Sequence, residues 1–120
     1  MNNDNKKTKN ENLIEHESVL LEAESIGNGD RNIDYGHPLD DFGKVAKMWE
    51  VVLGCSITAE QIGLCMICVK IARQTNRPKR DNMVDAAGYA ETVQKCIDER
   101  YRRETLFETF FNAVDERDSK

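Results

Sequence analysis

Charged side chains of opposite sign follow one another closely in residues 61–89, QIGLCMICVKIARQTNRPKRDNMVDAAGY. The segment first carries five basic residues within eleven positions and no acid among them: Lys70, Arg73, Arg77, Lys79 and Arg80. Two carboxylates and an aromatic hydroxyl then recur every four residues: Asp81, Asp85 and Tyr89. Lysine and arginine bind phosphate oxygens, while a carboxylate orients these cations or contacts a base or ribose. The segment therefore predicts a site for a phosphate-bearing ligand.

A second polar cluster lies in residues 27–38, GNGDRNIDYGHP, whose three glycines and proline are typical of an irregular connection. Four of its side chains are candidate ligand contacts: Arg31, Asp34, Tyr35 and His37. One interpretation is a surface turn capped by its own Asp and Asn side chains. The other is a loop that contacts the ligand, which the density of Arg, Asp, Tyr and His favours.

The four cysteines include a CxxC pair, Cys65 and Cys68, which in other contexts indicates a metal or redox site. Here the pair lies inside an apolar run without turn residues, and the only histidines are His16 and His37. Buried free cysteine behaves as a small hydrophobic residue. We therefore expect a structural role in the core, with a metal or redox site as the alternative.

Two helices are predicted before residue 54. Apolar residues recur at helical spacing in residues 11–26, and Gly27 and Gly29 are expected to end that helix. Pro38 suits the first turn of a second, strongly amphipathic helix that runs up to Gly54. Asp40 and Asp41 near its start are expected on the solvated face, with the alternative that one of them faces a site.

Residues 62–72 are almost all apolar, and Thr58 with Gln61 forms a capping box before them. Such a helix must be covered on most sides, either inside a bundle or by a second subunit. Lys70 interrupts the run and is expected either to reach solvent or to meet an anion. Arg73 shares its helical face.

The last helical region begins near Asp81, which is a good N-cap residue. Gly88 in its interior indicates close approach of a ligand or tight helix packing. No glycine or proline follows, so the chain either continues as one long helix or breaks near Arg103. An apolar stripe in residues 106–114 needs a partner, in the same chain or in a second copy.

No segment alternates with period two, so the fold class is all-α: a four- to five-helix bundle, oligomeric, with a long C-terminal helix. Residues 1–10 are polar and predict a disordered tail, and residues 11–120 predict one helical domain. No apolar signal region follows the first lysines and no apolar run is long enough to span a bilayer, which predicts a cytoplasmic protein. The net charge of −5 argues against a general nucleic-acid binder.

The segments DYGHPLDDFGKVAKMW and VKIARQTNRPKRDNMVDAAGYA together resemble a family of small phage and prophage helical proteins of unassigned function, over about residues 18–97. If the chain is phage-encoded, the host cytoplasm is its expected location. More remotely, the helix from Asp81 is similar to the final metal-binding helix of the MazG-like all-α nucleoside triphosphate pyrophosphohydrolases. That resemblance implies an oligomer that uses Mg²⁺ to release pyrophosphate. It makes Asp85 the aspartate of an acidic pair, with Asp81 or Asn82 near the position of a glutamate.

One departure from the MazG-like pattern concerns the preceding helix, which in that superfamily carries an EExxE-type cluster. Here the helix reads CMICVKIARQ, with Lys70 and Arg73 where acids are needed. Magnesium prefers several hard oxygen ligands. The residues therefore favour binding over hydrolysis and predict no cofactor.

Three hypotheses follow. The first is a non-catalytic nucleotide-binding protein that, in a phage, sequesters a nucleotide-derived signal of host defence. The second is a magnesium-dependent pyrophosphohydrolase that uses Asp81 and Asp85 with Asp34, Asp40 or Asp41. The third is an inhibitor or structural oligomer that binds protein through its phenylalanine-rich C-terminal helix. Magnesium dependence distinguishes the second from the first, and loss of function on truncation after Arg103 supports the third.

Overall fold

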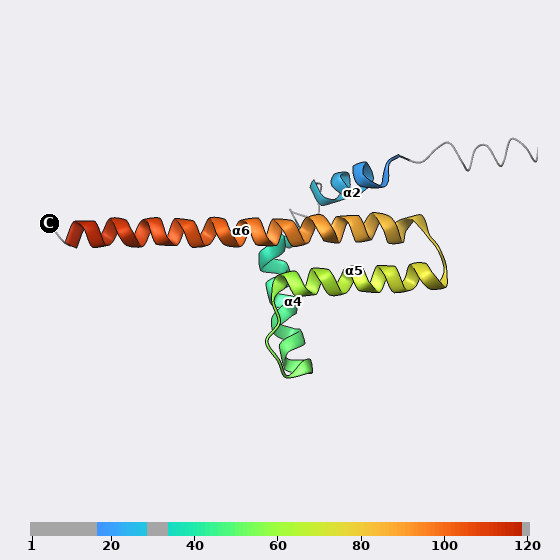
Figure 1. Cartoon of the computed structure of the whole chain (residues 1–120), viewed down its shortest axis with the longest axis horizontal. Helices are drawn as coiled ribbons and strands as arrows, with labels where there is room; N and C mark the ends of the chain where they lie inside the picture. The colour runs from blue at the N-terminus through green and yellow to red at the C-terminus, as the bar shows by residue number, and fades with distance from the viewer. Residues whose placement is uncertain (1–16, 29–33, 119–120) are drawn as a thin grey trace, which may run out of the picture.

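The computed structural model describes residues 17–28 and 34–118, and this part of the chain is all-helical (Figure 1). Its helices are α2 (Val19–Asn28), α4 (Pro38–Leu53), α5 (Ala59–Asn76) and α6 (Arg80–Asp118). The predicted all-α fold class and the long C-terminal helix are confirmed. The predicted disordered tail (residues 1–10) and the candidate Arg31 lie outside the described residues.

The ends of α4 follow from local sequence. Pro38 occupies its first turn, and the Nδ1 atom of the N-cap His37 accepts a 3.0 Å hydrogen bond from the Leu39 amide. At the other end Gly54 has φ 69°, a left-handed conformation that glycine adopts without steric cost, and its N–H donates to the Glu50 carbonyl. The bounds expected for this helix are confirmed.

The predicted capping box starts α5. Thr58 Oγ1 accepts from the Gln61 amide at 3.2 Å, and Gln61 Oε1 accepts from the Thr58 amide at 2.9 Å. The helix ends at Asn76, and Arg77 is extended because the residue before a proline disfavours the helical region. Pro78 thus sets the turn into α6.

Helices α5 and α6 form an antiparallel hairpin (Figure 1). Near the turn, Asn82 donates from Nδ2 to Gln74 Oε1 at 3.0 Å, and the same oxygen accepts from the Lys79 amide at 2.9 Å. Further along, the Lys70 ammonium lies 2.9 Å from an Asp85 carboxylate oxygen. These polar contacts fix the register between the two helices.

Helix α2 ends at Asn28, between the two glycines that were expected to stop it, Gly27 and Gly29. The predicted start of the last helix differs from the structure. Helix α6 already begins at Arg80, which places Asp81 in the first turn rather than at the N-cap. A carboxylate in the first turn is still favoured by the helix dipole. Of the alternatives left open near Arg103, the continuous helix is the one observed.

The single chain buries few side chains. The buried hydrophobic residues in its described part are Ala46, Ala59, Ile62, Val84 and Cys96. Only the N-terminal half of α6 has the other helices beside it, and its C-terminal half projects away from them (Figure 1).

Helix α5 is not covered on most sides by its own chain, because Leu64 and Ile71 are about half exposed. The expectation that Cys65 and Cys68 are core residues is wrong for a single chain, since both are exposed. Among the described helices, none is long and apolar enough to cross a membrane.

Candidate functional site

The two motifs singled out in the sequence meet beside Tyr89. A cavity of about 240 Å³ separates the segment around residue 35 from α6, and it is lined by Tyr35, Gly36, Pro38, Asp41, Phe42, Tyr89 and Thr92. The ring centroids of Phe42 and Tyr89 are 6.3 Å apart. The DYG segment and the helix of Tyr89 therefore line one cavity within a single chain.

The backbone at Gly36 positions one wall of this cavity. Gly36 has φ 74°, which turns the chain sharply between Tyr35 and the helix cap at His37. The first turns of α4 then carry Asp41 and Phe42 to the cavity. A glycine is needed here because a side chain at this φ would be strained.

Two further cavities, which lie between α2 and α6, share lining residues with this one. Tyr89 and Thr92 also line a small cavity of about 40 Å³, together with Asp85 and Gly88. Gly88 and Thr92 in turn line a cavity of about 510 Å³, which extends to Asn28 and Lys95. We call the three adjoining cavities the α2–α6 cleft.

Gly88 borders open space in this cleft. A Cβ atom built on it would have no heavy atom within 4 Å. Of the two explanations considered for a mid-helix glycine, tight packing against a neighbouring helix is therefore not the one observed. The missing side chain instead widens the cleft.

The charges along the cleft are mostly negative. Its described lining carries four acidic residues: Glu24, Asp41, Asp85 and Glu91. Lys95 is the one base among these lining residues, and its Nζ lies 3.3 Å from the Asn28 side-chain oxygen. Sequence reasoning missed Lys95. The available signal was its helical spacing from Asp85, Gly88 and Thr92, which places all four on one face of α6.

Of the two alternatives predicted for Lys70, contact with an anion is the one observed. The anion is the Asp85 carboxylate of the same chain. The Lys70 side chain is 15% exposed and the Asp85 side chain 41% exposed. Asp85 also lines the cleft, so this ion pair connects the cleft to the interior of the hairpin. A ligand at Asp85 would lie next to a paired cation rather than a free one.

The remaining basic residues of the predicted site lie elsewhere. Arg80 donates to the Glu22 carboxylate at 2.8 Å and to the Glu17 carbonyl oxygen, which ties the start of α2 to the start of α6. Three others are exposed near the turn between α5 and α6 and line none of the three cavities: Arg73, Arg77 and Lys79. Asp81 is exposed beside them, and Asp34 is exposed next to Tyr35.

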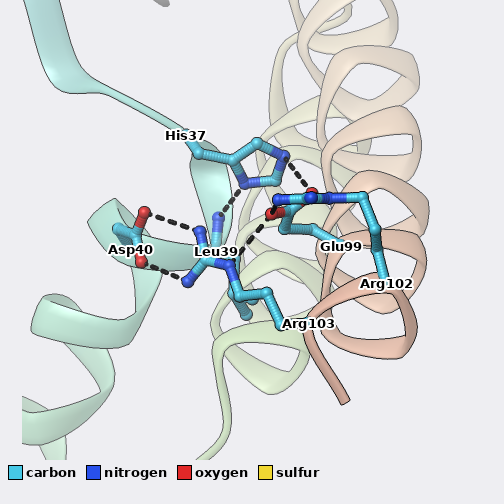
Figure 2. Close-up of polar contacts among 6 residues, drawn as sticks. All are labelled: His37, Leu39, Asp40, Glu99, Arg102 and Arg103. Carbon is cyan, nitrogen blue, oxygen red and sulfur yellow. Dashed lines mark hydrogen bonds and ion pairs between the residues drawn. The ribbon is translucent and has the colours of Figure 1, made fainter. Parts of the chain in front are cut away.

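His37 and Asp40 belong to a separate group of charges around Glu99, which we call the Glu99 cluster (Figure 2). Arg103 binds both Asp40 carboxylate oxygens, at 2.7 and 2.9 Å, and also donates from Nε to Glu99 at 2.9 Å. Arg102 donates from Nε to Glu99 at 2.9 Å, and His37 Nε2 lies 4.0 Å from the same carboxylate. The cluster joins the start of α4 to the middle of α6.

The cluster shifts the acidity of its carboxyl groups. Hydrogen bonds from Arg102 and then Arg103 lower the pKa of Glu99 to about 2. The Arg103 hydrogen bond likewise lowers the pKa of Asp40. Asp40 is about half exposed, as expected for the solvated face, whereas its neighbour Asp41 lines the cleft. His37 serves as a helix cap and is not among the described lining residues.

Gly63 was not singled out by sequence reasoning, yet it sets how closely the helices approach. A Cβ atom built on Gly63 would lie 2.5 Å from Val93 Cγ2 and 3.4 Å from Phe42 Cε2. Only glycine therefore lets α5 approach α4 and α6 this closely, which keeps Phe42 beside Tyr89. A glycine inside an apolar helix is the signal that could have identified it.

The described acidic residues do not gather as the magnesium site implied by the MazG-like resemblance would require. In residues 17–28 and 34–118, no three His, Cys, Asp or Glu side chains come together in a way that could hold a metal ion. Asp85 is already paired with Lys70, and Asp81 is exposed in the first turn of α6. The described donors thus do not fit a preformed magnesium cage.

Comparison with known proteins covers the cleft region. The model of a family described as a domain of unknown function, DUF6378, matches residues 18–97. The chain is similar to the Gene 55 proteins of Mycobacterium phages L5 and D29. It is 39% identical to the first over 89 residues and 37% identical to the second over 84 residues.

These matches cover 70% and 69% of this chain, and 57% and 56% of the two relatives. The chain therefore spans a little over half the length of the curated relatives it matches. No solved structure matches it. The matched residues 18–97 include every described residue that lines the cleft and end before the projecting half of α6.

Proposed function

The chain belongs to the DUF6378 family, and the relatives that it matches are phage proteins. From this premise we propose that it binds a phosphate-bearing nucleotide or a nucleotide-derived signal without hydrolysing it. The observation that carries the proposal is the meeting of Tyr35, Phe42 and Tyr89 around one cavity. Aromatic side chains bind nucleobases by stacking, at about 1–3 kcal/mol per base. Asp41 on the same cavity supplies an acceptor for a base amino group or a ribose hydroxyl.

The phosphate is expected at the other end of the cleft, near Lys95. Its ammonium has the neutral Asn28 side chain as its hydrogen-bond partner in the described structure, in contrast to Lys70, which is neutralised by Asp85. Tyr89 and Lys95 are six residues apart, which separates them by about 9 Å along the axis of α6 and by about a third of a turn around it. A ligand that contacts both must therefore follow the surface of α6 from the aromatic cavity, past Thr92, to Lys95.

The acidic lining narrows the class of ligand. Glu24 and Glu91 stand with Lys95 around the widest cavity and repel a highly charged polyphosphate. The proposal accordingly favours a ligand with few negative charges, such as a nucleoside monophosphate or a cyclic nucleotide. In a phage-encoded protein, stoichiometric binding of such a molecule would remove a host defence signal from solution.

A second candidate function is supported by the same acidic lining. Carboxylates are the ligands that Mg²⁺ prefers, and a triphosphate could bring the metal with it. This alternative is a MazG-like nucleoside triphosphate pyrophosphohydrolase. It is less well supported because the described donors form no metal cage. In addition, the Asp85 carboxylate is already ion-paired with Lys70.

Nucleotide capture tests the proposal. The purified protein is incubated with nucleoside mono- and triphosphates, cyclic nucleotides and cyclic dinucleotides, with and without Mg²⁺, and then desalted and heat-denatured. We expect an intact low-charge nucleotide to be released from the wild-type protein in either condition. Chromatography of the released material and of the flow-through identifies both bound and hydrolysed species.

Matched variants locate the site. Tyr89→Ala and Lys95→Ala are expected to abolish capture, whereas Tyr101→Ala and Lys47→Ala, at exposed positions that line none of the cavities, retain it. Monophosphate and pyrophosphate produced only with Mg²⁺ would favour the pyrophosphohydrolase. Absence of both capture and hydrolysis would contradict both functions and favour a protein partner.

A further inference from the structure

The projecting half of α6 carries a large unpartnered apolar face. We call residues 101–118 the tail. Its apolar side chains are 40–69% exposed, and they are Leu106, Phe107, Phe110, Phe111 and Val114. Phe107 and Phe111 contact one another, with ring centroids 5.9 Å apart. The described structure gives this face no other helix to cover it (Figure 1).

A second unpartnered face lies on the side of α5 that points away from the hairpin. Its residues, which we call the outer face of α5, are Leu64, Cys65, Cys68, Val69 and Ala72. Leu64 is 51% exposed, and both cysteines are exposed. Large side chains on the tail thus correspond to mostly small ones on α5, which is the combination that lets two helices pack closely.

The two faces have the same spacing. Tail residues 106, 107, 110, 111 and 114 match α5 residues 64, 65, 68, 69 and 72 at a constant offset of about 42 positions, because both elements rise by the same amount per residue. When Leu106 is level with Leu64, Phe110 is level with Cys68 and Val114 with Ala72. A parallel alignment therefore brings all five pairs together at once.

Charge favours the same orientation. Residues 104–118 contain five acidic residues and one basic residue, whereas residues 61–80 contain five basic residues and no acid. Parallel alignment places Asp115 and Asp118 at the C-terminal end of α5, where Arg77 and Lys79 are exposed and form no ion pair with other described residues. The opposite orientation would place these acids near Glu60, at the start of α5.

We propose that the tail of one copy packs along the outer face of α5 of a second copy, with the reciprocal contact closing a two-fold dimer. A tail parallel to the partner's α5 is antiparallel to the partner's α6, because α5 and α6 are antiparallel within each chain. Two antiparallel α6 helices are related by a two-fold axis, so both contacts form together. This inference does not depend on the proposed nucleotide site.

A tail-to-tail dimer is disfavoured by the same charges. It would bring two strongly acidic segments together and leave both outer faces of α5 exposed. The tail-to-α5 contact covers both apolar faces, together with the thiols of Cys65 and Cys68. It also accounts for the small number of side chains that the single chain buries.

Disulfide cross-linking tests the contact directly. In full-length protein with Cys55→Ser and Cys65→Ser, Phe110→Cys is expected to form a disulfide with Cys68 of the second copy. Thr109→Cys, one residue away and on a different face of the tail, is the matched control and is not expected to form it. Non-reducing gels and peptide mapping identify the linked residues.

Charge reversal provides an independent readout. We expect the wild-type protein to be a dimer by light scattering, and Asp115→Lys with Asp118→Lys to raise the dimer dissociation constant about tenfold. Arg77→Glu with Lys79→Glu should have a similar effect, and combining all four changes should restore dimerisation. Lys44→Glu, at an exposed position on α4, is the control and should leave the dimer intact.

The alternative outcomes overturn the proposal. A wild-type monomer at all concentrations would show that the two faces do not bind each other. A Phe110→Cys disulfide that persists when Cys68 is also replaced by serine would indicate a tail-to-tail dimer. Additive weakening by the four charge changes, without restoration, would contradict the parallel alignment.

Discussion

The two halves of α6 have similar helical geometry but very different surroundings. Residues 80–97 run beside α2 and α5 and carry the buried Val84 and Cys96. Residues 101–118 are exposed throughout. Both halves have apolar residues at helical spacing, so apolar periodicity identifies a face that needs covering but does not identify what covers it. The difference teaches that the packed half is held by close contacts within the chain, whereas the apolar residues of the tail are exposed in the single chain.

In the packed half, the substitution expected to lower the free energy of unfolding most is Gly63→Ala. The new methyl group would lie 2.5 Å from Val93 Cγ2, so the Val93 side chain or the helices must shift, and overpacking of this kind costs about 1–3 kcal/mol. Urea unfolding at fixed protein concentration, followed by circular dichroism, should show a lower midpoint. Gly43→Ala, which has no atom within 4 Å of its Cβ, is the matched control and should be neutral or stabilising. Equal destabilisation by both changes would contradict close packing at Gly63.

Cys96 sharpens the comparison by its chemical reactivity. Burial raises the pKa of its thiol from 9.0 to about 11, so the neutral form is favoured in the folded protein. The raised pKa of Cys96 adds to the free energy of unfolding, and this contribution is fully present below pH 9. It is lost as pH rises from about 9 to 11, because the thiol ionises at a lower pH in the unfolded chain than in the folded one.

At pH 8 and low protein concentration, iodoacetamide should therefore label the exposed thiols before Cys96: Cys55, Cys65 and Cys68. Mass spectrometry of tryptic peptides measures the order. Labelling of Cys96 at the same rate would indicate that the packed half opens readily. At higher concentration, protection of Cys65 and Cys68 but not of Cys55 is expected if the tail covers α5.

Gly88→Ala distinguishes the cleft side of α6 from its packed side. Alanine is a better helix former than glycine by up to about 1 kcal/mol, and no described atom would contact the added methyl group. We therefore expect a slightly higher unfolding midpoint together with weaker nucleotide capture, because the methyl group narrows the cleft. A stabilised variant with unchanged capture would place the ligand elsewhere.

The smallest expected effect concerns the Glu99 cluster at the boundary between the two halves. The pKa of Glu99 lies at about 2, below its ordinary 4.5, so the cluster stabilises the fold above pH 4.5 and this contribution is lost as pH falls from 4.5 towards 2. Glu99→Gln should make thermal unfolding less pH-dependent in that range. Glu104→Gln, at an exposed position in the tail, should leave the pH dependence unchanged.

Elements whose bounds depend on neighbouring residues were predictable from the sequence. Pro38, the left-handed Gly54 and the capping box of Thr58 and Gln61 are set by local backbone chemistry, and all three were found. Helix α2 likewise ends at Asn28, between Gly27 and Gly29. Asp81 shows the limit of such rules, because α6 begins one residue before it.

The composition of the site was only partly predictable. Tyr35, Asp85 and Tyr89 do line the cleft, but the basic residues between positions 70 and 80, which were expected to form one site with them, line none of its three cavities. Lys70 is bound to Asp85, and Arg80 is bound to Glu22, which is 58 residues away in sequence. The choice of such partners depends on tertiary packing, as does the close contact at Gly63. None of these is encoded in the spacing of residues along one helix.

The continuity of α6 has a mechanical consequence. About 45 Å of unbroken helix separates Gly88, at the cleft, from Asp118, at the end of the tail. If a ligand that entered between α2 and α6 tilted this rod by about 5°, the far end would swing by about 4 Å. Helix α6 would then act as a lever that converts ligand binding in the cleft into a displacement of its own C-terminal end.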